Sequence, residues 1–320
     1  MPPTELPALE WRPLTSNDAE IFSSLLHRIE THDELPYRTS TDEVRDFFRS
    51  TMAHSTIGGF VAGELKAYGY VRIKEGAGAI ATCQGGVDPD FRGLGIGRAL
   101  VTWQTDEARR MLADAQLPQR HITFQVEQGH ADLENHLIDL GYKWARSFYD
   151  LRAPLSADIH DIELGPFLRI EPWEAFEENV ILQAANRVAQ EQWNASPQTM
   201  ELWMSGRGAF RPDWSFVAVD NSGDRPTIAG YIMASRYAQD WSVLGWREGT
   251  IDMLGVLNDY RDTHLASALV AQTMRTQMDA GMQAVSAGVT STNHTAAISI
   301  YDSLGFTTVS TARLYTLDVD

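Results

Sequence analysis

A glycine-rich segment between a predicted strand and a predicted helix has the composition of an anion-binding loop. It runs Phe-Arg-Gly-Leu-Gly-Ile-Gly-Arg over residues 91–98. Glycines lack Cβ atoms, so the backbone can turn sharply and approach a ligand with consecutive N–H groups. The helix that begins here adds the positive end of its dipole, and guanidinium groups match phosphate oxygens in charge and geometry. We therefore expect a ligand that carries phosphates, bound by Val87, Arg92, Gly93, Leu94, Gly95, Ile96, Gly97 and Arg98.

The spacing of the glycines separates this segment from two common phosphate-binding motifs. Gly93, Gly95 and Gly97 follow the pattern Gly-x-Gly-x-Gly, whereas a dinucleotide fingerprint needs Gly-x-Gly-x-x-Gly. A Walker loop needs Gly-Lys-Ser/Thr, which is missing here. From Val87 to Leu100 the segment closely resembles the acetyl-CoA loop of the GCN5-related N-acetyltransferases, the GNAT family. The resemblance implies acetyl-CoA as the cosubstrate; the alternative is a glycine-rich turn that binds nothing.

The same order of predicted elements occurs twice along the chain. Residues 60–71 and 216–232 each form a strand, a turn and a second strand. A further strand, an arginine and a helix follow in both halves, and each half later contains Leu-Gly followed by an aromatic residue. We infer a tandem duplication that gives an α/β (α+β) protein. By resemblance it has two GNAT acyl-CoA acyltransferase folds, each a mixed, centrally splayed sheet flanked by helices, at 1–152 and 166–320.

The loop of the second copy has lost its glycines. Residues 261–266 run Arg-Asp-Thr-His-Leu-Ala, so Asp262, His264 and Ala266 replace glycine. Asp262 would repel a pyrophosphate, and His264 would compensate in part when protonated. Whether this copy binds acetyl-CoA stays open. The residues assigned to its coenzyme site are Val256, Arg261, His264, Ala266 and Asn293.

A motif near the end of each copy is intact only in the second copy, the reverse of the glycine loop. Residues 293–306 match the family pattern Asn-x-x-Ala-x-x-x-Tyr-x-x-x-Gly-Phe, whereas the first copy has Leu137 at the tyrosine position. In the family the tyrosine hydroxyl faces the sulfur of the coenzyme. The resemblance therefore implies that Tyr301 is the general acid. The alternative is an aromatic side chain that packs a helix onto the sheet.

A carboxylate four residues before Val256 is the predicted general base. Strand alternation would place Asp252 on the same face as Leu254 and Val256. There it would take a proton from the incoming ammonium group, often through water. Glu248 is a second candidate, and a purely structural carboxylate paired with an arginine is the alternative. The first copy has Cys83 at this position and no evident base.

The implied chemistry is a direct attack of an amine on the thioester, without an acyl-enzyme. A main-chain N–H at or beside Val87 or Val256 would stabilise the tetrahedral oxyanion, where the strand separates from its neighbour. A covalent route through Cys83 is disfavoured, because a cysteine in a strand is usually a small buried hydrophobe.

Composition narrows the class of protein and its partners. The chain has 320 residues, a hydrophobic fraction of 43%, a net charge of −17 and one cysteine. The acidity disfavours nucleic acid as a partner, and the single cysteine excludes an intrachain disulfide. No apolar run reaches membrane-spanning length. We expect a cytoplasmic monomer or homodimer that uses no metal and acts on a small-molecule primary amine.

Two functions from different classes remain open. The first is an N-acetyltransferase, supported by the glycine loop with Asp252 and Tyr301. The second is a non-catalytic protein that binds or senses acyl-CoA, because the intact loop and the intact acid lie in different copies. This division is similar to tandem GNAT proteins of the mycothiol-synthase type. In those proteins the C-terminal copy is catalytic and the N-terminal copy can still hold acetyl-CoA.

Overall fold

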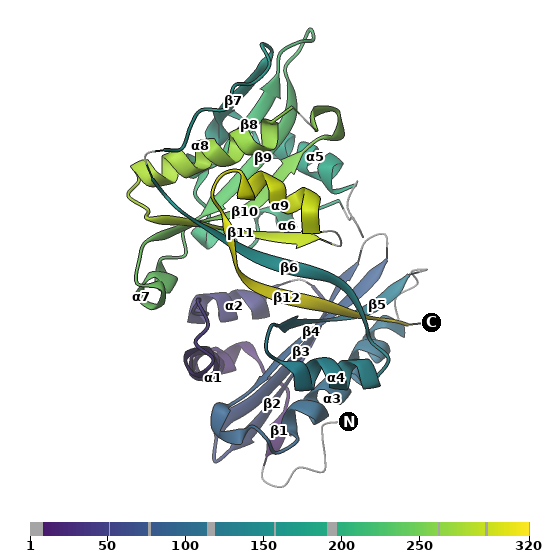
Figure 1. Ribbon diagram of the computed structural model, residues 1–320. Helices are drawn as coiled ribbons and strands as arrows, with labels where there is room; N and C mark the ends of the chain where they lie inside the picture. Colours follow the sequence, from purple (N-terminus) through teal and green to yellow (C-terminus); the bar gives the residue numbers. More distant parts are fainter. Residues whose placement is uncertain are drawn as a thin grey trace. The chain divides into compact units, whose positions relative to one another are not determined.

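The computed structural model describes residues 9–50, 52–75, 78–113, 119–156, 158–190, 197–261, 263–291 and 294–319. The chain forms two compact units, which are described separately (Figure 1). Unit 1 contains Met1–Arg146 and Ala312–Asp320, and unit 2 contains Ser147–Thr311. None of the described helices is long and apolar enough to cross a membrane.

Unit 1 is a mixed sheet with helices on both faces. Its strands, in spatial order, are β1 (Glu10–Arg12), β2 (His54–Val61), β3 (Glu64–Glu75), β4 (Ala79–Val87), β5 (Arg120–Glu127) and the last part of β12 (Thr307–Asp318). The pair β4–β5 is parallel and the other neighbours are antiparallel. The helices are α1 (Ala19–His32), α2 (Thr41–Arg49), α3 (Ile96–Ala113) and α4 (Ala131–Asp139).

Hydrophobic clusters on both faces of the sheet hold the helices of unit 1 in place. Leu25 and Val44 bring α1 and α2 against Tyr68 on one face. Leu112 brings α3 against the opposite face, where Val71 lies. Tyr68 and Val71 are three residues apart on β3, and such residues point to opposite faces of a strand. The alternation of apolar residues along β3 therefore fixes which helices cover which face.

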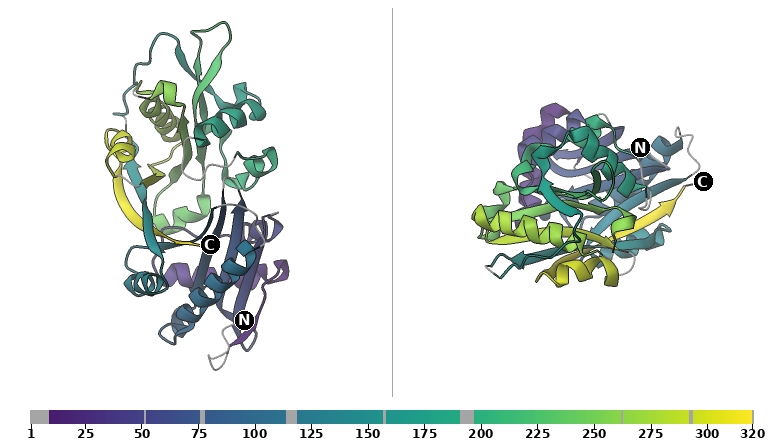
Figure 2. Two further views of the ribbon diagram at one scale, coloured as in Figure 1. Left: turned by 90° about the vertical axis from the view of Figure 1, so that its right-hand side faces the viewer. Right: turned by 90° about the horizontal axis from the view of Figure 1, so that it is seen from above.

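Unit 2 repeats this arrangement. Its strands, in spatial order, are β6 (Lys143–Pro154), β11 (Ala284–Ser291), β10 (Glu248–Val256), β9 (Thr227–Ser235), β8 (Phe216–Asp220) and β7 (Leu168–Pro172). The pair β10–β11 is parallel and the other neighbours are antiparallel. Its helices are α5 (Glu178–Ala189), α6 (Met200–Met204), α7 (Trp241–Leu244), α8 (Leu265–Asp279) and α9 (His294–Asp302). Helices α8 and α5 cover opposite faces of this sheet (Figure 2).

The last strand of each copy pairs with a strand from the other half of the sequence. From Ser147 to Pro154, β6 pairs with β11 in unit 2. From Ala312 to Asp318, β12 pairs with β5 in unit 1. Each compact unit therefore includes a strand from the other half of the sequence. The boundaries of the two copies along the sequence, 1–152 and 166–320, stay a prediction.

In both units the parallel pair separates before its strands end. Pairing of β4 with β5 stops at Cys83 and Phe124, whereas β4 stays paired with β3 up to Val87. Pairing of β10 with β11 stops at Ile251 and Ala287, although β10 and β9 stay paired up to Val256. The predicted mixed, centrally splayed sheet flanked by helices is thus present in each unit.

We predict that a chain ending at Thr311 destabilises unit 1. The deletion removes the partner of β5 and the buried side chain of Tyr315 from the cluster that contains Phe124. Losing one such aromatic side chain costs about 3 kcal/mol, which lowers Tm by about 6 °C or more. Thermal unfolding and amide hydrogen exchange of β5 measure the effect.

A chain that ends at Asp318 keeps the paired strand and is the control. Unchanged Tm and unchanged protection of β5 in the chain that ends at Thr311 would contradict the observed pairing.

Candidate active site

The glycine loop of unit 1 has the backbone conformation expected of an anion cradle. The loop follows β4 and leads into α3, which begins at Ile96. Gly93 and Gly95 have φ values of 77° and 81°, in the left-handed region that favours glycine. A Cβ atom at Gly93 or Gly97 would meet no atom within 4 Å. The backbone here is therefore open to a ligand, and Leu94 and Arg98 are exposed beside it.

Arg92, beside this loop, forms an ion pair with a carboxylate. Its guanidinium makes two hydrogen bonds to the carboxylate of Asp33, at 2.6 and 2.8 Å. Its Nε donates to the carbonyl oxygen of Val87 at 3.2 Å. The pair with Arg92 lowers the pKa of Asp33, against the opposing effect of burial. In this structure Arg92 ties the end of α1 to the loop.

The loop of unit 2 keeps the same turn without glycine. His264 precedes α8 at the position of Gly95 and has a φ of 60°. Its backbone is left-handed, which costs a non-glycine residue about 1 kcal/mol. Ala266 lies half-buried in the first turn of α8, and Arg261 is exposed. Asn293, which was assigned to this site, and Asp262, which was expected to repel a pyrophosphate, lie outside the described residues.

Tyr301 lies on α9 with 6% of its surface exposed. Its ring packs edge-to-face on Phe306, with the centroids 5.1 Å apart. Burial raises the pKa of its hydroxyl to about 12, so the group is protonated at neutral pH. A protonated tyrosine can donate a proton, and its packing also serves the core that includes Leu265 and Leu269.

Asp252 lies at a β-bulge, where β10 leaves β11. The register of β10 with β9 shifts between Ile251 and Met253. Leu254 and Val256 pack with the cluster beneath α8, whereas Met253 packs with the cluster beneath α5. The expectation that Asp252 shares a face with Leu254 and Val256 is wrong, because the extra residue of the bulge interrupts the alternation.

Two hydroxyl groups from β9 and the residues after it hold the carboxylate of Asp252. Ser235 donates to Oδ2, and Tyr237 donates to Oδ1 at 3.3 Å. Although the side chain is exposed, nearby protein atoms partly desolvate it and raise the pKa of Asp252, and the two donors oppose this effect. The raised pKa makes this carboxylate a stronger base than a free aspartate. No sequence pattern indicated Ser235 and Tyr237, since only strand pairing brings Ser235 near β10.

Glu248 is part of a buried ion pair. Arg152 on β6 donates to it at 2.6 Å, and the indole N–H of Trp246 donates at 2.9 Å. Glu248 is 7% exposed, and Trp241 donates to its carbonyl oxygen. These contacts assign Glu248 a structural role. The geometry therefore favours Asp252 over Glu248 as the base.

Unit 1 has neutral groups at the corresponding position. Cys83 is 3% exposed, and burial raises the pKa of its thiol. The side-chain amide of Gln104 on α3 donates to the carbonyl oxygens of Gln84 and Tyr70, at 2.7 and 3.2 Å. These contacts tie α3 to β4 close to the point where β4 leaves β5. Unit 1 thus lacks a carboxylate where unit 2 has Asp252.

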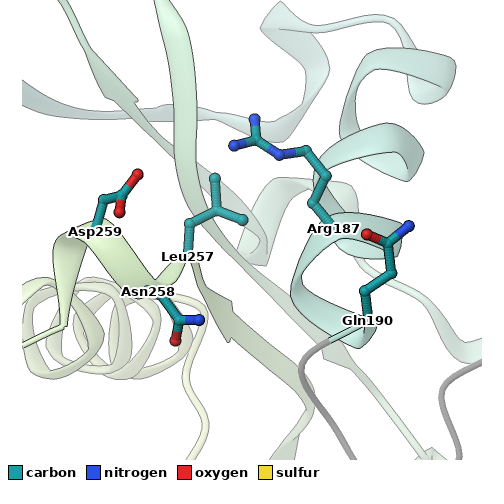
Figure 3. A pocket seen from close by; sticks show the side chains of 5 residues that line it. All are labelled: Arg187, Gln190, Leu257, Asn258 and Asp259. Atoms are coloured by element: carbon teal, nitrogen blue, oxygen red, sulfur yellow. The ribbon is translucent and has the colours of Figure 1, made fainter.

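A hollow of about 160 Å³ in unit 2 lies between the end of α5 and the residues that follow β10 (Figure 3). Its lining residues are Arg187, Gln190, Leu257, Asn258 and Asp259. In unit 1 the corresponding arginine, Arg28, donates to Asp88 at 2.9 Å. Unit 2 has Leu257 at the position of Asp88, so Arg187 forms no such ion pair within the described part of the chain.

One family model matches most of the second copy. Residues 173–306 match a family model described as the acetyltransferase (GNAT) family. Among the described residues, no group of three or more His, Cys, Asp or Glu side chains could hold a metal ion. No curated protein matches the sequence at a significant level.

Solved structures cover nearly the whole chain. A GCN5-related N-acetyltransferase from Sphaerobacter thermophilus has a TM-score of 0.74 at 21% identity, with coverage of 97% of this chain and 95% of that chain. A tandem GNAT protein from the clavulanic acid biosynthesis pathway has a TM-score of 0.70 at 16% identity, with coverage of 97% and 98%. These likenesses confirm the predicted fold of two tandem GNAT copies.

We predict that His264→Gly stabilises unit 2 by about 1 kcal/mol, because glycine adopts the left-handed backbone without strain. Ala266→Gly is the matched control in the same loop. It should destabilise by about 0.5–1 kcal/mol, since glycine is unfavourable inside a helix. Urea unfolding of both variants measures these differences. A destabilising effect of His264→Gly would be inconsistent with the left-handed turn.

Proposed function

We propose that this chain, whose residues 173–306 match the acetyltransferase (GNAT) family model, is an acetyl-CoA-dependent N-acetyltransferase of a small primary amine. The family performs acyl transfer. The proposal adds acetyl-CoA as the donor, an amine as the acceptor and unit 2 as the place of the reaction. The observation that carries it is Asp252, a carboxylate held by two hydroxyls where β10 leaves β11.

The opening beyond Ile251 supports binding of an extended acyl donor. Pairing with β11 ends at Ile251, so one edge of β10 from Asp252 to Val256 no longer pairs with β11. Backbone N–H and C=O groups need partners, and the amide groups of an extended ligand can supply them. The phosphates of the donor would then lie at the start of α8, near Arg261, His264 and Ala266.

Asp252 and Tyr301 have complementary roles in the proposed reaction. Asp252 takes a proton from the ammonium group of the acceptor, and the free amine attacks the thioester carbonyl carbon. A main-chain N–H at or beside Val256 stabilises the oxyanion. The C–S bond breaks as Tyr301 protonates the sulfur, and the proton then lost by the nitrogen restores the tyrosine. The proton on Asp252 passes to solvent.

Unit 1 supports a second function, the binding of acyl-CoA without chemistry. Its loop has left-handed Gly93 and Gly95 and an open surface at Gly97. Cys83 provides no base, because its thiol is buried and its pKa is raised. Unit 1 would thus hold the coenzyme as a sensor or a reservoir, with Val87 and Arg98 at the ends of the site.

We predict that Asp252→Asn and Tyr301→Phe each lower kcat by about 100-fold or more, as is usual for a lost proton-transfer group. Because the pKa of Asp252 is raised, the acid limb of the kcat/KM profile lies above the pH at which free aspartate titrates. Activity therefore falls as the pH falls through this raised value, and Asp252→Asn abolishes that limb. Steady-state kinetics across pH with an amine panel measure both effects.

Cys83→Ala, at the matching position of unit 1, is the control and should leave kcat unchanged. Full activity of Asp252→Asn and Tyr301→Phe, with loss in Cys83→Ala, would place the reaction in unit 1. Absence of acetyl transfer to every amine would favour the sensor.

A further inference from the structure

A second carboxylate, Asp150, lies in the same row of the unit 2 sheet as Asp252. Asp150 on β6 is directly opposite Gly288 on β11. Gly288 follows Ala287, which forms the last pair with β10 at Ile251, so Gly288 and Asp252 are the first residues beyond the end of that pairing. Asp150 belongs to the first copy along the sequence, and the pairing of β6 brings it into unit 2.

Asp150 and Asp252 point to the same face of the sheet. Leu151 packs with the cluster beneath α8, so its neighbour Asp150 points to the opposite face. Arg152, two residues further along β6, points the same way as Asp150 and reaches Glu248. Asp252 is bonded to Ser235 on this face rather than on the face of α8.

The space between the two carboxylates is open. A Cβ atom added at Gly288 would meet no atom within 4 Å. Two strand spacings separate β6 from β10, about 10 Å, and the separation of β10 from β11 widens this further. A small molecule can therefore lie over Gly288 with one carboxylate at each end.

Within the described part of the chain, no positively charged side chain forms an ion pair with the carboxylate of Asp150. This carboxylate also makes no hydrogen bond with the residues that the structure describes. The charge of Arg152 acts on it, but the guanidinium of Arg152 is bonded to Glu248 through Nε and Nη2, at 2.6 and 3.4 Å. Partial desolvation raises the pKa of Asp150, and Arg152 opposes this only in part. A bound cation would compensate the desolvated carboxylate.

We propose that Asp150 binds a second positive charge on the acceptor, so that the preferred substrate is a diamine whose two nitrogens span Asp252 and Asp150. This rests on the proposed function. The amine at Asp252 reacts and the amine at Asp150 anchors the molecule. Asp150 is thus a specificity-determining residue that the first half of the sequence supplies to unit 2.

The test compares cadaverine with pentylamine, which has the same carbon chain and one nitrogen. The wild-type chain should prefer cadaverine. Asp150→Asn should lower kcat/KM for cadaverine by about 10- to 100-fold, mainly through KM, since a charge-assisted hydrogen bond is lost. Its kcat/KM for pentylamine should not change. Asp224→Asn, in an exposed turn, controls for the loss of one negative charge and should leave both substrates unaffected.

Asp150→Glu keeps the charge and should retain the preference for cadaverine, which separates a binding role from misfolding. Equal kcat/KM values for the two amines in the wild-type chain, or an unchanged preference for cadaverine in Asp150→Asn, overturn the proposal.

Calorimetric titration of the full chain with cadaverine separates this proposal from the proposed function. Binding that Asp150→Asn weakens about 10-fold supports the cation site even if neither amine is acetylated, and the failure then lies with the acetyltransferase function. No binding to the wild-type chain, or equal binding to both chains, overturns the cation site.

Discussion

The early end of one parallel strand pairing is the constraint on which unit 2 depends. After Ile251, β10 remains paired with β9 but no longer with β11. The backbone edge that is released needs hydrogen-bond partners, and an extended ligand can provide them. The bulge at the same point turns Asp252 away from Leu254 and toward Ser235. The unpaired backbone edge and the candidate base thus have one structural origin.

The two units share the same framework and differ by small substitutions at corresponding positions. In unit 1 the left-handed turn has Gly95, and a buried aspartate neutralises Arg28. In unit 2, His264 adopts the same turn and Leu257 replaces that aspartate. Unit 2 also depends on the first half of the sequence, because the exchanged strand β6 supplies it with groups from that half.

The sequence was informative where function depends on short-range spacing. The glycine loop and the repeated order of elements could be predicted from local patterns, whereas the splayed sheet was implied by the resemblance of that loop to a known family. The bonding of Arg92 to Asp33 could not, because the partners are 59 residues apart. Arg152 and Glu248, 96 residues apart, meet only because β6 pairs with β11. The face of Asp252 was predicted wrongly, since alternation does not reveal a bulge.

The central claim, that unit 2 holds the acyl donor where it reacts, can be tested by amide hydrogen exchange with and without acetyl-CoA. The account predicts new protection at the end of β10 and in the first turn of α8, around Val256 and Leu265. Protection confined to residues 92–100, with no change in unit 2, would contradict it.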